Sequence, residues 1–123
     1  MNKKILIAED SSVIQNLTKK ILENKQYTIV SAKNGKEVIT IVNKETIDLI
    51  LMDINMPQMD GMSCAKEIRK SSTASIAGIP IIAITGNARN YSDADFTEAG
   101  FNDVLPKPLD FDKLVELVKQ HVK

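Results

Sequence analysis

Short apolar runs rich in Ile, Leu and Val alternate along this chain with longer amphipathic stretches. An apolar run bounded by polar residues is typical of a strand that is buried on both faces, and apolar residues at helical spacing are typical of a helix packed on one side. Their alternation is the pattern of βαβ units, in which a helix connects two parallel strands. The sequence therefore predicts an α/β fold with helices on both faces of a parallel sheet.

The predicted strands share a high content of β-branched and aliphatic residues. They are residues 4–8, 28–32, 49–52, 81–84 and 103–105. The central runs are apolar nearly throughout, which requires cover on both faces of the sheet. Pro106 follows the last run and fits an edge strand, where a missing N–H donor is tolerated.

The predicted helices differ in the clarity of their apolar stripes. Ser11 or Ser12 can cap a helix with the stripe Ile14, Leu17, Ile21 and Leu22, and Asp110 can cap another with Phe111, Leu114, Val115, Val118 and Val122. Residues 35–43 and 62–70 form weaker stripes, and 90–99 forms the weakest. The small and hydroxyl residues of 71–78 indicate a surface loop without a domain boundary.

Composition limits the classes of function. The 123 residues are expected to form one domain, residues 1–123, because this length can bury a sufficient core without disulfides. The 16 basic and 16 acidic residues cancel, which argues against direct binding to nucleic acid or to an anionic membrane. The absence of an export signal or bilayer-length apolar segment, together with the single cysteine, Cys64, leads us to expect a cytoplasmic protein.

Polar side chains follow four of the predicted strands. Ligands of an open parallel sheet bind outside the carboxyl ends of its strands, where the strand order reverses. Glu9 and Asp10 follow the first strand and Asp53 follows the third. The fourth strand leads into Thr85, Gly86 and Asn87, and the last leads to Lys107. We therefore expect these groups to meet at one edge of the sheet.

Three carboxylates in one crevice require a counter-charge, because mutual repulsion would otherwise raise their pKa values. Lys107 supplies one positive charge, and a divalent ion bound by Asp10 and Asp53, with Glu9 reaching it through water, would neutralise the rest. Oxygen ligands favour Mg²⁺, with Mn²⁺ as an alternative, and a main-chain carbonyl near Asn55 could complete the octahedron. Zinc is disfavoured because Cys64 lies on an inward helix stripe and His121 lies near the chain end.

Such a site can support phosphoryl transfer. A carboxylate beside Mg²⁺ and a lysine can attack phosphorus, which makes Asp53 the candidate nucleophile and an aspartyl phosphate the product. The hydroxyl of Thr85 can donate to a phosphoryl oxygen. The amide of Gly86 can add a second donor at a place where we expect a side chain to crowd.

The segment Asp-Ile-Asn-Met-Pro-Gln-Met-Asp-Gly at 53–61, with Glu9-Asp10, Thr85 and Lys107-Pro108, resembles bacterial two-component receiver domains over the whole chain. The resemblance implies a flavodoxin-like (βα)5 fold with strand order 2-1-3-4-5. It implies that Asp53 is the phosphoacceptor and that Glu9, Asp10, Asp53 and the main-chain carbonyl of Asn55 hold Mg²⁺. It further implies that Thr85 and Lys107 sense the phosphoryl group and that the Lys107–Pro108 peptide is cis.

The resemblance also implies the partners. The donor would be a phosphohistidine on a histidine kinase or a histidine phosphotransfer protein, and a downstream protein would read the change near the last two helices. The family usually has an aromatic residue three positions before the lysine, where this chain has Val104, so the form of that change is open. The run Thr-Gly-Asn-Ala at 85–88 resembles receivers of hybrid kinases and phosphorelays.

Other interpretations compete with this one. Taken singly, Glu9 and Asp10 could cap a helix, and Lys107 could be a solvated surface residue. A haloacid-dehalogenase-like hydrolase would need a second acid where Asn55 stands, so turnover of a separate substrate is not expected. A flavin or nucleotide module would need a phosphate-cradling loop after the first strand, where the acid pair would repel phosphate. A degenerate receiver that docks without phosphorylation remains the alternative.

Overall fold

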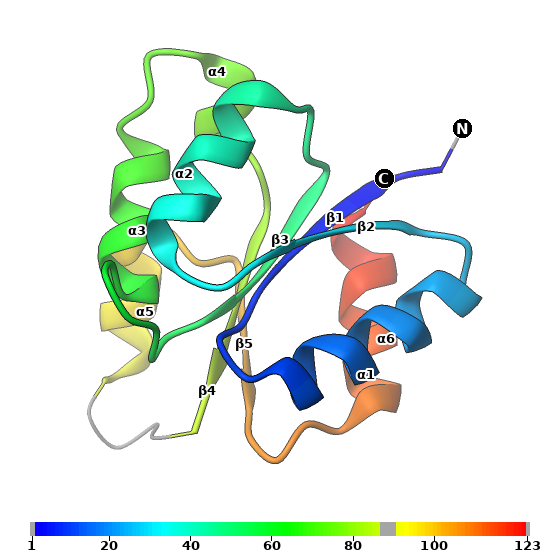
Figure 1. The fold of residues 1–123 in the computed structure, drawn as a ribbon. Coiled ribbons are helices and arrows are strands. Elements are labelled where there is room, and N and C mark those ends of the chain that lie inside the picture. Colours follow the sequence, from blue (N-terminus) through cyan, green and yellow to red (C-terminus); the bar gives the residue numbers. More distant parts are fainter. Residues whose placement is uncertain (1, 87–90, 123) are drawn as a thin grey trace.

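The computed structural model describes residues 2–86 and 91–122. Five parallel strands form a sheet in the order β2-β1-β3-β4-β5 (Figure 1). The strands are β1 (Lys4–Ala8), β2 (Thr28–Ala32), β3 (Leu49–Asp53), β4 (Ile81–Thr85) and β5 (Asp103–Pro106). The helices are α1 (Ser12–Asn24), α2 (Gly35–Lys44), α3 (Gly61–Arg69), α4 (Ala74–Ala77), α5 (Asp93–Ala99) and α6 (Phe111–His121). The predicted fold class and strand order are confirmed.

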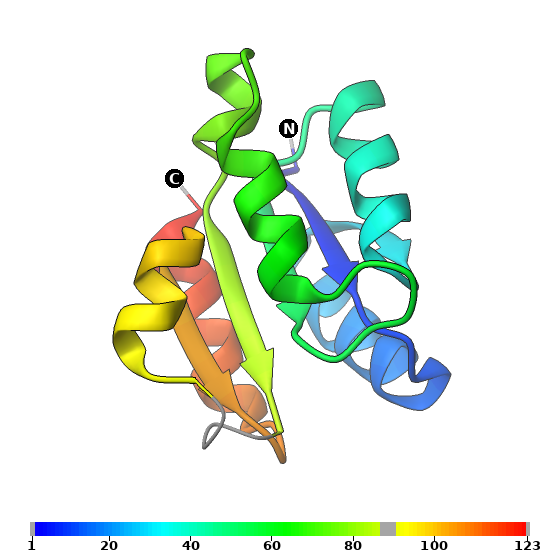
Figure 2. The same cartoon turned by 90° about the vertical axis from the view of Figure 1, so that its left-hand side faces the viewer.

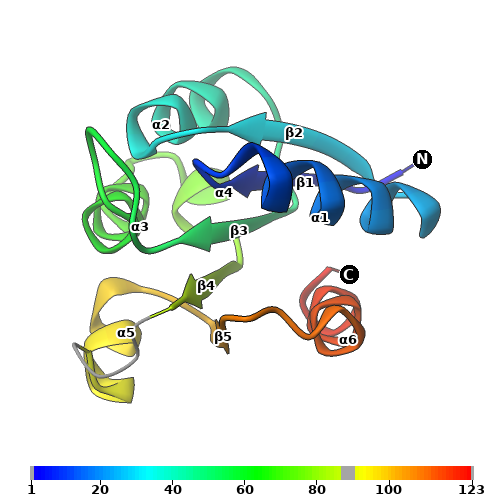
Figure 3. The same ribbon diagram turned by 60° about the horizontal axis from the view of Figure 1, so that its bottom comes forward.

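The sheet separates two apolar clusters. Helices α2, α3 and α5 pack on one face, and α1 and α6 pack on the other (Figures 2 and 3). Because β3 and β4 are buried at every position, their side chains contribute alternately to the two clusters. Cys64 of α3 is fully buried, and burial raises the pKa of its thiol to about 12.

Side-chain caps begin most of the longer helices. The Ser11 hydroxyl accepts from the Ile14 amide at 3.4 Å, so the cap of α1 is Ser11 rather than Ser12. Asp110 caps α6 by accepting from the amides of Asp112 and Lys113. These acceptors bond N–H groups that have no partner within the helix. The first turns therefore begin close to where the sequence predicts them.

Two sequence predictions about helices are wrong. Leu17 was assigned to the buried stripe of α1, but 47% of its surface is exposed; α1 buries Gln15, Thr18 and Leu22 instead. Residues 71–78 are not entirely a loop, because they contain the single turn α4. In the predicted helix 90–99, α5 begins at Asp93, and Asn90 lies outside the described residues.

Three strands end one residue further along the chain than predicted. β3 ends at Asp53, β4 ends at Thr85 and β5 ends at Pro106. Asp53 pairs with Ile84 across β3 and β4, and Thr85 pairs with Pro106 across β4 and β5. The two polar side chains are therefore held by the ladder of the sheet rather than by a loop.

Candidate functional site

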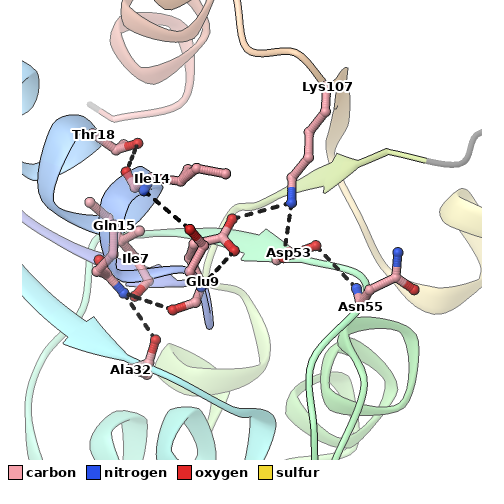
Figure 4. Close-up of polar contacts among 10 residues, drawn as sticks. Ile7, Glu9, Ile14, Gln15, Thr18, Ala32, Asp53, Asn55 and Lys107 are labelled. Carbon is pink, nitrogen blue, oxygen red and sulfur yellow. Dashed lines mark hydrogen bonds and ion pairs between the residues drawn. The ribbon is translucent and has the colours of Figure 1, made fainter.

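The carboxyl edge of the sheet brings together side chains from the ends of three strands. Glu9 follows β1, Asp53 ends β3, and Lys107 follows β5 (Figure 4). The Lys107 Nζ lies 3.1 Å from Asp53 Oδ2 and 3.4 Å from Glu9 Oε1. Thr85, at the end of β4, is also buried at this edge. The groups that the sequence placed at this edge are thus close together, apart from Asn87, which lies outside the described residues.

Both carboxylate oxygens of Asp53 accept hydrogen bonds, which hold the side chain in place. Only 1% of its surface is exposed, and its strand lies between β1 and β4. Its Oδ1 accepts from the main-chain amide of Asn55 at 3.1 Å, and its Oδ2 accepts from Lys107. This geometry fixes the carboxylate in one orientation, which a nucleophile requires.

Glu9 is a buried acid with an incomplete set of partners. Its Oε2 accepts from the Ser11 amide at 3.2 Å, but its Oε1 has no hydrogen bond within the described part of the chain. Burial and, after it, the neighbouring Asp53 carboxyl group raise the pKa of Glu9 to about 7. The Ser11 amide and the charge of Lys107 oppose this rise without cancelling it. The site therefore carries more negative charge than one ammonium group neutralises.

Lys107 is positioned by its backbone as well as by its charge. Its amide donates to Thr85 O at 2.8 Å, and the Lys107–Pro108 peptide is cis. Burial lowers the pKa of the Lys107 ammonium, but the hydrogen bond and charge of Asp53, together with the charge of Glu9, outweigh it and raise the pKa. Lys107 therefore stays protonated beside the two acids and joins the ends of β4 and β5.

The acid cluster fits a hard divalent cation. Glu9, Asp10 and Asp53 each offer one carboxylate oxygen, and these atoms lie within 4.8 Å of one another. The Glu9 Oε1 atom is buried and accepts no hydrogen bond from the described residues. An oxygen donor set with spare negative charge suits Mg²⁺ or Mn²⁺, and Asp10 is exposed, so solvent can complete a coordination shell. Asn55 is the second residue of the loop after β3, and its main-chain carbonyl remains the predicted fourth ligand.

Glycines at the site have different roles. A Cβ on Gly61 would lie 2.5 Å from Asp53 O, so a side chain there would displace the main chain of the phosphoacceptor candidate. A Cβ on Gly86 would lie 3.6 Å from Lys107 Cδ, which is an ordinary contact. A Cβ on Gly86 would therefore not clash with any of the described residues, and the expectation that a side chain there would crowd them is wrong.

Sequence reasoning missed Gln15. Its side chain is buried beneath the acid pair and donates to main-chain carbonyls at the ends of β1 and β2. The signal was available in the spacing, because Gln15, Thr18 and Leu22 follow one another at helical intervals of three and four. Attention to apolar residues alone favoured the neighbouring stripe that includes Leu17.

Comparisons of the sequence with known proteins give a consistent result. The family model described as the response regulator receiver domain matches residues 5–119. The chain is 36% identical to hybrid signal transduction histidine kinase M of Dictyostelium discoideum, with 96% of the chain covered. It is also 36% identical to the CAI-1 autoinducer sensor kinase/phosphatase of Vibrio cholerae, with 94% covered. The chain spans only 5% and 17% of the lengths of these two relatives.

Solved structures agree with the sequence comparisons. The receiver domain of a sensor histidine kinase from Pseudomonas aeruginosa superposes with a TM-score of 0.88 at 30% identity, covering 99% of this chain and 98% of that one. That structure has a magnesium ion coordinated in its active-site cleft. None of the described helices in the present chain is long and apolar enough to cross a bilayer.

Proposed function

The chain belongs to the response regulator receiver domain family of two-component signalling, and we propose that residues 1–123 form one receiver domain that accepts a phosphoryl group on Asp53. The observation that carries this proposal is the position of the Asp53 carboxylate. It is buried at the carboxyl edge of the sheet, bonded to Lys107 and within reach of Glu9 and Asp10. This arrangement provides a fixed nucleophile, a cation and a set of oxygen ligands.

The residues divide the chemistry between them. Asp53 attacks phosphorus of a phosphohistidine, so an O–P bond forms as the P–N bond breaks and the imidazole leaves with the electron pair. When bound by Glu9, Asp10, Asp53 and the Asn55 carbonyl, Mg²⁺ supplies positive charge next to the phosphoryl oxygens. Lys107, which contacts Asp53 and Glu9, supplies an ammonium donor, and Thr85 at the end of β4 and the amide of Gly86 after it would donate to the same group.

A haloacid-dehalogenase-like hydrolase would need a second acid two residues after its nucleophile. Here that position holds Asn55, which contacts Asp53 through its main-chain amide. An amide side chain cannot act as a general base, so we propose that the aspartyl phosphate persists as a signal. The domain would then take part stoichiometrically, without turnover of a separate substrate.

The proposed donor is a histidine kinase or a histidine phosphotransfer protein. Relatives named as hybrid signal transduction histidine kinases support this proposal, because the segment that matches this chain lies within a protein that is itself a histidine kinase. The proposed output is a shift between two arrangements of α5, β5 and α6, read by a downstream protein. The hydrogen bond from the Lys107 amide to Thr85 O supports this, since it links the phosphate-facing end of β4 to the β5–α6 connection.

The test is intact mass after incubation with acetyl phosphate and Mg²⁺. We expect the wild-type protein to gain one phosphoryl group and Asp53→Asn to gain none. Asp112→Asn, an exposed acid on α6, is the matched control and should react like the wild type. Excess chelator should abolish the gain.

The outcomes separate the two interpretations. Modification of Asp53→Asn to the wild-type level would show that another residue is the acceptor. Failure of the wild type to react with Mg²⁺ demonstrably bound, with acetyl phosphate and with a phosphorylated histidine phosphotransfer protein, would contradict the proposal. It would favour a docking module that acts without phosphorylation.

A further inference from the structure

We infer that Gln15 is a positioning residue for the acid pair, fixing the main chain from which Glu9 and Asp10 project and thereby setting the affinity of the site for a divalent cation. The inference rests on the proposed function, because it concerns the same metal site. Gln15 belongs to α1, only 6% of its surface is exposed, and it offers no ligand in the acid cluster itself. Its effect must therefore pass through the residues that it contacts.

The side-chain amide of Gln15 joins the ends of two strands. Its Nε2 donates to Ile7 O at 3.1 Å, Ala32 O at 3.1 Å and Glu9 O at 3.3 Å (Figure 4). The amide of Glu9 also donates to Ala32 O, at 3.0 Å. Ala32 O, the last carbonyl of β2, therefore accepts a hydrogen bond from the Glu9 amide. It is also linked to Glu9 O through the Gln15 side chain, which donates to both oxygens.

The orientation of this amide is set by its surroundings. An NH₂ group has two protons, and here they are shared among three carbonyl oxygens, each of which can only accept. A flipped amide would place Oε1 against these three oxygens, which would lose all three hydrogen bonds and bring acceptor against acceptor, and this is costly. The Nε2 group is therefore the end that faces the strands.

The contact with Glu9 O has a specific consequence for the acids. This oxygen belongs to the peptide group between Glu9 and Asp10, so holding it fixes the plane from which both side chains project. No described residue donates a hydrogen bond to the Asp10 carboxylate or forms an ion pair with it, so its position depends on its main chain. Mg²⁺ requires a near-ideal octahedron, and small errors in ligand position reduce its affinity.

The test compares Gln15→Met with a matched variant of the same helix. Methionine keeps the length and volume of the side chain and removes both donors. Thr18→Val is the control, because Thr18 is equally buried one turn further along α1 and its hydroxyl bonds only Ile14 O among the described residues. Mn²⁺ is titrated into each metal-free protein, free Mn²⁺ is measured by electron paramagnetic resonance, and the melting temperature is recorded in chelator.

We expect Gln15→Met to weaken Mn²⁺ binding about 10-fold, the range seen when groups that orient metal ligands are removed. Thr18→Val should lower the melting temperature and leave the Mn²⁺ dissociation constant within about twofold of the wild type, as expected for a change remote from the ligands. A Gln15→Met protein that folds and binds Mn²⁺ as the wild type does would overturn the inference. If the wild type itself binds neither Mn²⁺ nor Mg²⁺, the proposed function is contradicted as well.

A second measurement needs no variant. In the wild-type protein, Mg²⁺ should shift the side-chain NH₂ resonances of Gln15 with the same midpoint as the main-chain amide of Asp10. The side-chain resonances of the exposed Gln120 on α6 serve as the reference and should stay unchanged. A shift at Asp10 with none at Gln15 would overturn the inference even if Gln15→Met failed to fold.

Discussion

Glu9 and Asp53 share one ammonium group although both carboxylates are almost fully buried. Lys107 contacts the two acids at 3.4 and 3.1 Å, and it remains about one quarter exposed, with 26% of its side-chain surface open. Burial of Glu9, followed by the effect of the nearby Asp53 carboxyl group, raises the pKa of Glu9 to about 7. Without a metal the cluster therefore carries an electrostatic cost, which is the expected condition of a site that binds a cation during its function.

The electrostatic cost of burying Glu9 beside Asp53 predicts that the free energy of unfolding depends on pH. The pKa of Glu9 is about 7 in the folded protein against 4.5 as its ordinary value, so between these pH values the folded state binds more protons than the unfolded state. Stability contributed by Glu9 is complete near pH 4.5 and is lost as the pH rises through about 7. Glu9→Gln, which is neutral throughout, should therefore gain stability relative to the wild type at the higher pH.

The measurement is urea unfolding in chelator at about pH 5 and about pH 8. The stability of Glu9→Gln minus that of the wild type should be larger at the higher pH by on the order of 2 kcal/mol. Glu116→Gln, an exposed glutamate on α6, should show no such difference. An equal effect of Glu9→Gln at both pH values would contradict the raised pKa.

At the scale of the secondary-structure elements, Arg69 anchors the last turn of α3 to the segments that follow α4 and α5. The guanidinium donates to Ala77 O and Ile79 O, on either side of the turn before β4, at 2.6 and 2.7 Å. It also donates to Gly100 O through both Nε and Nη2, at 2.9 and 2.6 Å. One side chain thus connects the end of α3, the start of β4 and the end of α5. Burial lowers its pKa, and carbonyl acceptors, with the Asn102 side chain, take the place of an acid.

Arg69→Met should destabilise the fold by about 3 kcal/mol, because it removes charged hydrogen bonds to three partly buried carbonyl oxygens. Lys66→Met, which removes an exposed charge from the same helix, is expected to change stability by less than about 0.5 kcal/mol. Urea unfolding measures both. Amide hydrogen exchange should locate the loss around Gly100 and Ile81. Equal stabilities of the two variants would show that the guanidinium bonds contribute nothing to folding.

The elements also show where sequence reasoning succeeds. Apolar runs placed all five strands. The central strands β1, β3 and β4 are apolar nearly throughout because they are buried on both faces, whereas the edge strands β2 and β5 are partly exposed and carry shorter apolar runs. The face of α1 was misjudged since the helix buries Gln15, whose polar amide is needed at the strand ends, and exposes Leu17. Periodicity records where apolar residues occur, whereas burial of a polar residue depends on acceptors from distant parts of the chain.

At the candidate site, sequence order and fold class were sufficient to bring Glu9, Asp53 and Lys107 to one edge. Parallel strands point the same way, so residues that follow them must share an edge. The raised pKa of Glu9 and the support from Gln15 could not be derived in this way. Both depend on distances of a few ångströms between side chains, and a strand assignment does not specify such distances.

At the scale of the whole molecule, the sheet divides the core formed by residues 2–86 and 91–122 into two separate apolar clusters. Val38 belongs to the cluster under α2, α3 and α5, whereas Leu22 and Leu114 belong to the cluster under α1 and α6. Each cluster is filled by side chains from opposite faces of the same strands. Cavities made on one face should therefore leave packing on the other face almost unchanged.

Double-mutant cycles measure this independence. Val38→Ala and Leu114→Ala are each expected to cost about 2–4 kcal/mol, and their effects should add to within about 0.5 kcal/mol. Leu22→Ala and Leu114→Ala remove neighbours within one cluster and should depart from additivity by more than that. Urea unfolding measures each corner of the cycles. Strong coupling between Val38 and Leu114 would show that the sheet transmits strain between its faces.

The two ends of the described chain lie away from the reactive edge. Lys4 begins β1, and His121 at the end of α6 lies 3.2 Å from Asp103 at the beginning of β5, so both mark the edge of the sheet opposite Asp53. A protein fused at either end would be joined on the far side of the domain from Asp53. A fused partner there would not block access of a phosphodonor to Asp53. Any effect of phosphorylation on that partner would have to pass through the packing of the helices across the whole domain.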